Sequence, residues 1–321
     1  MKPAFSIVFF TVSSGAGLGL LALLALADLF APDALAGRVV WRAALLGLFL
    51  VAAGLASSVL HLANPRNAWR AFARFRSSWL SREAVFAAAL FPIAAIYAAL
   101  AAGAAKGAWR DFFALATCLV AWAVLFSTSM IYASLKPIRQ WRTTWTPLNY
   151  LLLGHWSGAL LLAAMAAAYA GSAPFFLLGA LLGLVALGVK LAYWYSIGER
   201  SAGAKRAPTL ERAIGVEAGV HGPGTMTAAR ARLLDVGHSH GTFLTDEFGF
   251  VLARRHAKVL RGAAIVLGFL LPLAWLLAGA AHWQLGVAAA CCGIMGLLAE
   301  RWLFFAEARH TVRLYHGDPR T

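Results

Sequence analysis

Charged residues are scarce in this sequence, and acidic ones most of all. Only 13% of the 321 residues are charged, against roughly 25% in soluble globular proteins, while 61% are hydrophobic. A soluble chain of this length needs a polar surface around its core, and 13% charge is too little to build one. The composition therefore excludes an ordinary soluble domain and favours an integral membrane protein.

Cysteine is rarer still, with only Cys118, Cys291 and Cys292. All three lie inside apolar runs without the spacing of metal ligands, and adjacent cysteines rarely bridge each other. We therefore expect them to pack helices, and we expect no iron–sulfur cluster in this chain. Residues 1–30 also lack a twin-arginine motif and a small-residue cleavage site, which predicts a retained first helix.

Long apolar runs are abundant. A bilayer-spanning helix needs about 20 such residues. Eight runs meet this length, at residues 5–29, 40–62, 84–103, 112–135, 148–170, 175–195, 262–281 and 285–305. The sequence therefore predicts an all-α integral membrane fold with about eight transmembrane helices.

Positive charge dominates, with a formal net charge of +15. In a soluble protein this would suggest nucleic acid, but no nucleic-acid motif is present, so we expect no such partner. The Lys and Arg residues outside the apolar runs divide 22 against 3 between the two sides, and the poorer side has only Arg38, Lys106 and Arg110. Cytoplasmic loops carry the excess of Lys and Arg, so both termini are predicted to be cytoplasmic.

The loop lengths suggest an internal repeat of four helices. Residues 79–86 and 243–250 share the pattern aromatic-Leu-(Ser/Thr)-x-Glu-x-x-Phe. This predicts a first unit at 1–135, a second at 136–306 that includes a long cytoplasmic loop at 197–261, and a tail at 307–321. A simpler interpretation is that hydroxyl and acidic residues favour any helix N-terminus.

Polar groups at the membrane edge are the candidates for chemistry. His61 ends the second apolar run, and Glu83 begins the third. Between them, residues 66–82 alternate arginines with aromatic residues, which is typical of a segment lying at the interface. This segment would return Glu83 to the side of His61, where the pair suits proton-coupled chemistry on a quinone. Both residues also have structural interpretations, as a helix-end hydrogen-bond donor and as a carboxylate favoured by the helix dipole.

Other polar residues occur near or within the runs. His155 and His61 would allow a haem interpretation, but their placement is poor for paired ligands. Lys190 is expected to reach the cytoplasmic edge with its long side chain. Glu300 and Arg301 are expected to pair or to face the bundle interior.

Several short motifs resemble the membrane-anchor subunits of the dimethyl sulfoxide reductase family. They are Leu60-His61-Leu62-x-x-Pro65, Arg70-Ala71-Phe72, Ser78-x-x-Ser81-x-Glu83, Trp145-Thr146-Pro147 and Arg301 with Phe304 and Phe305. The resemblance implies an eight-helix, haem-free subunit of the bacterial inner membrane. Its implied partners are an iron–sulfur subunit with four clusters and a molybdopterin catalytic subunit, and its implied substrate is a quinone, ubiquinone or menaquinone. His61 and Glu83 match the positions that the family associates with its quinol site. To these we add Ser81, Arg82 and Arg70, because they are close in sequence.

Two basic stretches depart from the reductase anchors, at residues 230–234 and 254–258. They resemble the anchors of cytoplasmic sulfite-oxidising complexes, a branch of the same family. The leading hypothesis is therefore an anchor that passes electrons from sulfite oxidation to quinone, while the substrate reaction itself takes place in another polypeptide. Two alternatives are a quinol-oxidising anchor of a terminal reductase and a secondary transporter.

Overall fold

The computed structural model describes residues 4–60, 64–103, 107–168, 173–202, 252–278 and 282–311. These residues form helices and one isolated β-bridge, between Ile138 and His310. The first helices are α1 (Phe5–Phe30), α2 (Gly37–Val59), the 3₁₀ helix η1 (Pro65–Arg74), α3 (Trp79–Ala102) and α4 (Ala108–Ala133). The later ones are α5 (Trp145–Ala167), α6 (Ala173–Ala202), α9 (Leu252–Ile265), the π-helical segment η2 (Val266–Leu270), α10 (Leu271–Ala278) and α11 (Trp283–Ala306).

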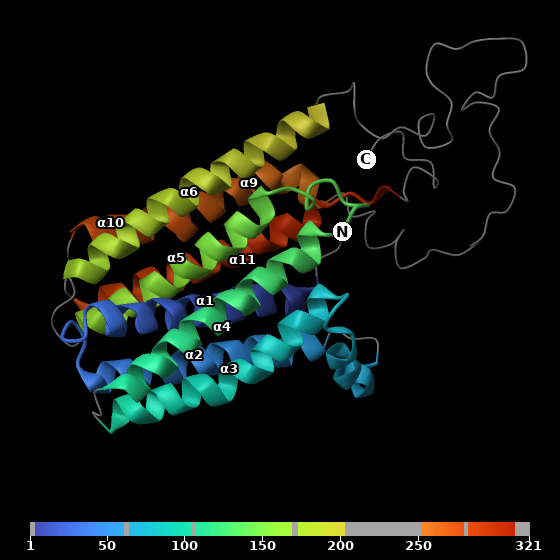
Figure 1. Ribbon diagram of the computed structural model, residues 1–321. Helices are drawn as coiled ribbons and strands as arrows, with labels where there is room; N and C mark the ends of the chain where they lie inside the picture. Colours follow the sequence, from blue (N-terminus) through green and yellow to red (C-terminus); the bar gives the residue numbers. More distant parts are fainter. Residues whose placement is uncertain are drawn as a thin grey trace, which may run out of the picture.

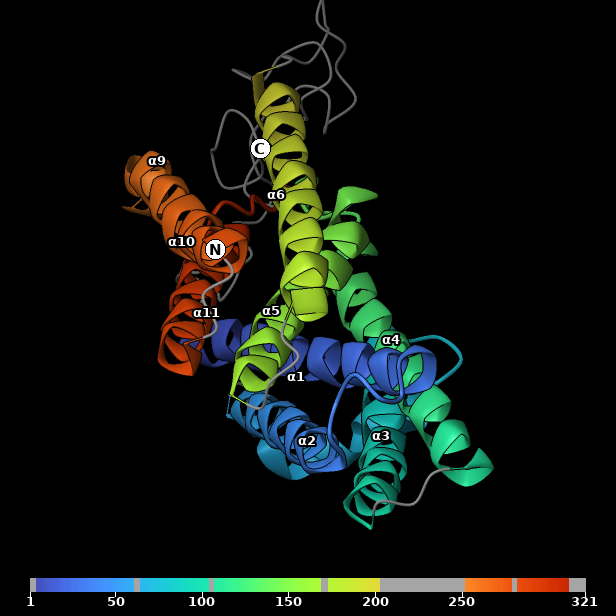
Figure 2. The same cartoon turned by 90° about the vertical axis from the view of Figure 1, so that its left-hand side faces the viewer.

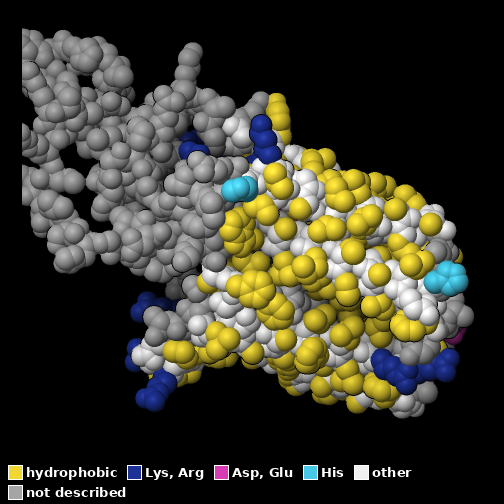
Figure 3. Space-filling model, turned by 180° about the vertical axis from the view of Figure 1, so that it is seen from behind, with side chains coloured by type: hydrophobic (Ala, Val, Ile, Leu, Met, Phe, Trp, Pro, Cys, Tyr) yellow, Lys and Arg dark blue, Asp and Glu magenta, His cyan; other side chains and the backbone are white. Residues whose placement is uncertain are grey.

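Eight of these helical segments are long and apolar enough to cross a membrane, as predicted. The seventh span, His256–Ala278, joins α9, η2 and α10. Exposed Phe49, Phe112 and Leu181 lie on the outer faces of the bundle, and apolar side chains cover its long face (Figure 3). This protein is therefore a multi-pass membrane protein.

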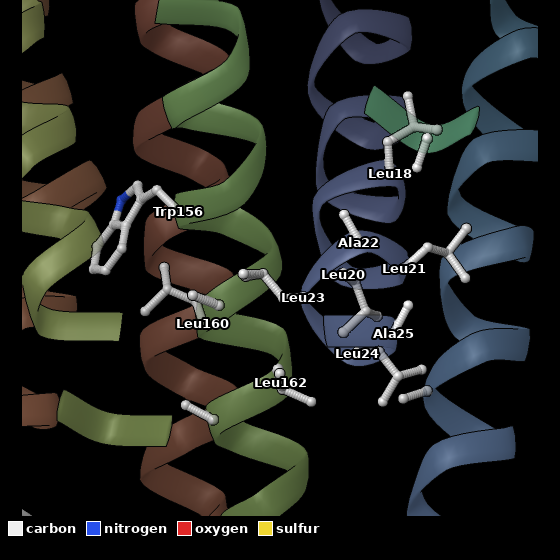
Figure 4. Close-up of a cluster of buried hydrophobic side chains, with 14 of the residues drawn as sticks. Leu18, Leu20, Leu21, Ala22, Leu23, Leu24, Ala25, Trp156, Leu160 and Leu162 are labelled. Carbon is white, nitrogen blue, oxygen red and sulfur yellow. The ribbon is translucent and has the colours of Figure 1, made fainter. Parts of the chain in front are cut away.

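Helix α1 occupies the centre of the bundle. It packs against α2, α4, α5 and α11, with α2 and α3 on one side of it and α5, α6 and α9–α11 on the other (Figures 1 and 2). Leu20 and Leu24 of α1 are fully buried and belong to the same cluster as Leu160 of α5 (Figure 4). The predicted division into two four-helix units stays a prediction, and the second copy of the repeated motif, at 243–250, lies outside the described residues.

The two described termini lie at the same end of the bundle. Val8, near the start of α1, shares an aromatic cluster with Ile138 and Phe304. The start of α3, the end of α4 and the loop at 134–144 lie there too, together with most of the described basic loop residues. We call this end the terminal end. Its predicted cytoplasmic orientation stays a prediction.

Glycines allow α1 and α5 to pack with their backbones in contact. A Cβ atom on Gly158 of α5 would overlap the backbone of Gly19 and Leu20 in α1. Small residues serve this purpose in membrane helices, where close van der Waals packing replaces the hydrophobic effect as the force between helices. The central position of α1 therefore depends on this contact.

Replacing Gly158 with alanine is expected to force α1 and α5 apart and to destabilise the bundle by about 1–3 kcal/mol, the usual cost of overpacking. The readout is the thermal unfolding midpoint in detergent. Gly188→Ala in α6 is the matched control, because a Cβ there meets no atom within 4 Å in the described part of the chain. Equal midpoints for the two variants would contradict this account of α1.

Candidate functional site

A pocket of about 690 Å³ lies at the terminal end, between the last turns of α2, most of η1 and the first turns of α3. Leu55, Val59, Trp69, Phe72 and Leu80 supply much of its apolar wall. Its polar lining includes Asn64, Asn67, Arg70, Ser81 and Glu83. We call it the η1 pocket. A predominantly apolar pocket with a few polar groups is typical of a small-molecule site, and its volume is in the usual range.

The wall formed by η1 follows from its sequence. Pro65 begins this 3₁₀ helix, and its arginines alternate with aromatic residues. The backbone N–H of Arg74 donates to Ser81 Oγ at 3.1 Å, which joins the end of η1 to α3. Within the segment predicted at residues 66–82, η1 is a 3₁₀ helix packed on α3, and the segment from Trp79 onward belongs to α3 itself. Its predicted place at the membrane interface stays a prediction.

Arg82 closes the turn between η1 and α3. Its guanidinium donates to the carbonyls of Phe75 at 3.0 Å and Arg76 at 2.8 Å, and it stacks over the Trp79 ring at 4.1 Å. It is not among the residues that line the η1 pocket. Its contacts therefore stabilise the turn between η1 and α3, whereas Arg70, Ser81 and Glu83 line the pocket together.

Glu83 is the buried acid of the pocket. Helix α3 begins at Trp79, earlier than the apolar run predicts, so Glu83 lies one turn inside the helix and is only 4% exposed. Its carboxyl group is hydrogen-bonded to the Thr128 hydroxyl of α4, which also contacts the Val124 carbonyl at 3.0 Å. Sequence analysis missed Thr128, because an isolated threonine in an apolar run carries no signal of which neighbour it faces.

The Glu83–Thr128 pair accommodates both protonation states of the acid. The hydroxyl of Thr128 has one hydrogen and two acceptors in reach, Glu83 and Val124. When Glu83 is ionised, Thr128 donates to it. When Glu83 is protonated, it donates to Thr128, which then donates to Val124. A proton can therefore come and go with no movement of heavy atoms.

His61 lies outside the described residues. The site role of Glu83, Ser81 and Arg70 stays a prediction, as does that of His61 and Arg82. What the structure adds is the placement of three of these five side chains around one pocket.

His155 is fully engaged with protein partners. Trp122 Nε1 donates to its Nε2 at 2.8 Å, and its Nδ1 lies 2.7 Å from the Leu151 carbonyl, to which it donates. An iron ligand would have to break one of these two bonds. The contacts of this ring therefore favour a bridge between α4 and α5 over a haem ligand.

A second group of buried charges lies at the terminal end, on α6 and α11. Lys190 and Glu300 are each 0% exposed and form an ion pair, and Arg301 Nε contacts the other Glu300 oxygen at 2.6 Å. We call these residues the buried triad. The expected pairing of Glu300 with Arg301 is confirmed. The expectation that Lys190 reaches the membrane edge is wrong, because its partner is Glu300 in the interior.

A helical bundle with eight candidate membrane spans and a pocket at one end has the architecture of a multi-pass membrane protein. Comparison with known proteins narrows this class. Residues 1–305 match the model of the family described as DMSO reductase anchor subunit (DmsC), and the chain belongs to that family. It is also 34% identical, over an alignment of 338 residues, to a subunit of sulfite dehydrogenase from Allochromatium vinosum. The alignment covers 98% of this chain and 99% of that relative. The resemblance expected from the motifs is confirmed.

Proposed function

We propose that this membrane anchor subunit reduces a quinone in the η1 pocket, using electrons that a sulfite-oxidising molybdenum complex delivers to it. The observation that carries the proposal is the buried Glu83 carboxyl group in the wall of a large, mostly apolar pocket. The sulfite part of the proposal is supported by the name of the Allochromatium vinosum relative. The oxidation of sulfite would take place in a partner subunit.

The pocket has the properties that quinone chemistry requires. A quinone ring and the first part of its tail are apolar, so they match the aromatic and aliphatic wall. Reduction to the quinol adds two electrons and two protons. The electrons would come from the nearest cluster of an iron–sulfur partner, and Glu83 and His61 would supply the protons to the two carbonyl oxygens. Thr128 holds the Glu83 carboxyl group in either protonation state.

The terminal end also presents a surface for the partner. Arg66, Arg74 and Arg76 are exposed on or next to η1, and Arg142 is exposed in the loop after α4 at the same end of the bundle. Exposed cations steer an acidic partner to the correct face and make its association sensitive to salt. We propose that the iron–sulfur subunit docks here, on the cytoplasmic side, so that its last cluster lies close to the pocket.

The test is Glu83→Gln in the assembled complex. Loss of a positioned proton donor is expected to lower quinone-linked turnover about 10³-fold, within the range for general acid catalysis. Oxidation of sulfite with a soluble dye as acceptor is expected to stay at the wild-type rate. His61→Ala is expected to give the same pattern.

Asp111→Asn is the control for the Glu83 test, because this acid lies exposed in the first turn of α4, at the opposite end of the bundle. It should leave both activities unchanged. Wild-type quinone turnover in Glu83→Gln would reject the proposed site.

The family match keeps a second direction of electron flow open, in which the same pocket oxidises quinol for a terminal reductase. The pocket chemistry is then reversed, and Glu83 accepts a proton. An assay of the co-purified catalytic subunit decides between the two directions. Oxidation of its substrate supports quinone reduction in the pocket, and reduction of its substrate supports quinol oxidation.

A further inference from the structure

A line of polar and aromatic contacts leads from Glu83 away from the η1 pocket. Thr128 and Tyr132 lie one turn apart on α4, and hence on the same face. The Tyr132 ring stacks on Tyr150 of α5 with 5.6 Å between centroids, and both phenols interact electrostatically with the Glu83 carboxylate. The line therefore passes from α3 through α4 to α5 inside the bundle.

The line continues into a small cavity whose lining is mostly apolar, with a few polar groups. The cavity measures about 20 Å³ and is lined by residues that include Thr11, Tyr150, Ser157 and Arg301. The hydroxyl of Tyr150 and both Arg301 Nη atoms are buried, and none has a hydrogen bond of normal geometry within the described part of the chain. Thr11 and Ser157 donate to backbone carbonyls of their own helices, so each hydroxyl oxygen is available as an acceptor.

These features are those of a water site. A volume of about 10–15 Å³ is enough for one water, which needs two to four polar partners. Leaving a buried polar group unsatisfied costs about 1–3 kcal/mol, and a water in the cavity beside Tyr150 and Arg301 reduces that cost for several groups at once. The geometry therefore favours a filled cavity.

Arg301 belongs both to the lining of the cavity and to the buried triad. Beyond the triad lies a second hollow at the surface of the bundle. Arg301 pairs with Glu300, and Glu300 with Lys190. Lys190 lies over the Trp194 ring at 5.1 Å, and Arg261 lies over the same ring at 5.4 Å. Arg261 and its partner Glu307 line a hollow of about 220 Å³ at the terminal end. We call it the Glu307 hollow.

A bound quinone creates a need for a second route by which protons reach Glu83. A quinone that fills the η1 pocket displaces water from the exposed side of the carboxyl group. Once Glu83 has given its proton to the quinone, the carboxylate must be reprotonated from its other side, where Thr128 lies.

Resting on the proposed function, we propose that the cavity lined by Tyr150 and Arg301 holds water and forms part of a lateral proton path from the Glu307 hollow to Glu83. One proton enters for each proton that Glu83 donates, and every intermediate group gives one proton and takes one. From the hollow, Glu307, Lys190 and Glu300 pass the proton inward to the water. The Tyr150 hydroxyl takes it from the water, and Thr128 delivers it to Glu83. Arg301 stays charged throughout and orients the water.

Tyr150→Phe in the whole complex tests this path, because it keeps the ring and removes only the hydroxyl. The quinone-linked kcat is expected to fall about 10²-fold, the lower end of what a positioned proton-transfer group contributes. The KM for quinone and the sulfite-to-dye rate are expected to be unchanged. The solvent deuterium isotope effect on kcat is expected to rise, a change that a merely structural role would not produce.

Tyr195→Phe is the matched control, because this tyrosine is 68% exposed on α6. A Tyr150→Phe complex with kcat within twofold of wild type overturns the path. So does a loss of kcat with no change in the isotope effect. If Glu83→Gln abolishes quinone turnover while Tyr150→Phe does not, only the path is wrong. If Glu83→Gln has no effect, the proposed function itself fails.

Discussion

Replacing Glu300 with alanine is expected to prevent stable folding of this subunit. Glu300 is the shared partner of Lys190 and Arg301, and all three side chains are buried. Removing the one carboxylate leaves two cations in the interior without their anion. Breaking a buried ion pair in this way costs about 3–5 kcal/mol. The measurements are the yield of monodisperse protein in detergent and its thermal unfolding midpoint.

Glu307→Ala is the matched control, just past the end of α11. Its partner Arg261 has a side chain that is 33% exposed, and partly exposed pairs contribute about 1 kcal/mol or less. Combining Glu300→Ala with Lys190→Met removes one orphaned cation and is expected to recover part of the stability. If Glu300→Ala is as stable as Glu307→Ala, the triad does not hold α6 and α11 together.

Aromatic rings complete the stabilisation of the buried triad. Two cations share one carboxylate, so the triad has an excess of positive charge. Lys190 lies over the Tyr193 ring at 4.3 Å, and Arg301 lies over the Tyr150 ring at 4.3 Å. The negative face of an aromatic ring attracts a cation, and more strongly when both are removed from water. The aromatic residues around the end of α11 therefore stabilise the buried cations in addition to packing the helices together.

Hydropathy was sufficient to predict the spans but not their arrangement. The number and rough position of the eight helices follow from apolar length, which the bilayer thickness dictates. The central place of α1 does not, because a helix in lipid is apolar whether it faces lipid or protein. Its glycines were the available signal, since Gly15, Gly17 and Gly19 recur on a helix that others must approach closely.

The candidate site was predictable in part. The alternation of arginines and aromatics predicted a segment that returns Glu83 toward the end of α2, and Glu83 and Val59 do line the same pocket. The pocket itself was not predicted. The hydrogen bonds of Arg82 to the turn were not predictable, because they depend on which carbonyls the turn presents. Thr128 as the partner of Glu83, and Lys190 as the partner of Glu300, were also missed, since the pairing of side chains on different helices depends on the rotation of each helix about its axis.

The second large effect is expected at the opposite end of the bundle, where Asp28 lies in the last turn of α1. Asp28 is 6% exposed and accepts hydrogen bonds from Tyr97 of α3 at 3.0 Å and from Arg110 of α4 at 2.8 and 2.5 Å. Sequence analysis counted Arg110 only as a loop cation. Its two-pronged contact with a buried carboxylate instead fastens three helices at one point.

Asp28→Ala is expected to destabilise the subunit by about 3–5 kcal/mol, because it removes the carboxylate that pairs with the buried Arg110. Tyr97→Phe removes one neutral donor and is expected to cost about 1 kcal/mol. The pair Asp28→Ala with Arg110→Met is expected to be more stable than Asp28→Ala alone, and additive losses would contradict the ion pair. Since Glu83 and the η1 pocket lie at the terminal end, the Asp28→Ala complexes that do assemble should keep the wild-type KM for quinone. A raised KM would mean that the Asp28 contacts among α1, α3 and α4 at one end of the bundle control the shape of the η1 pocket at the other end.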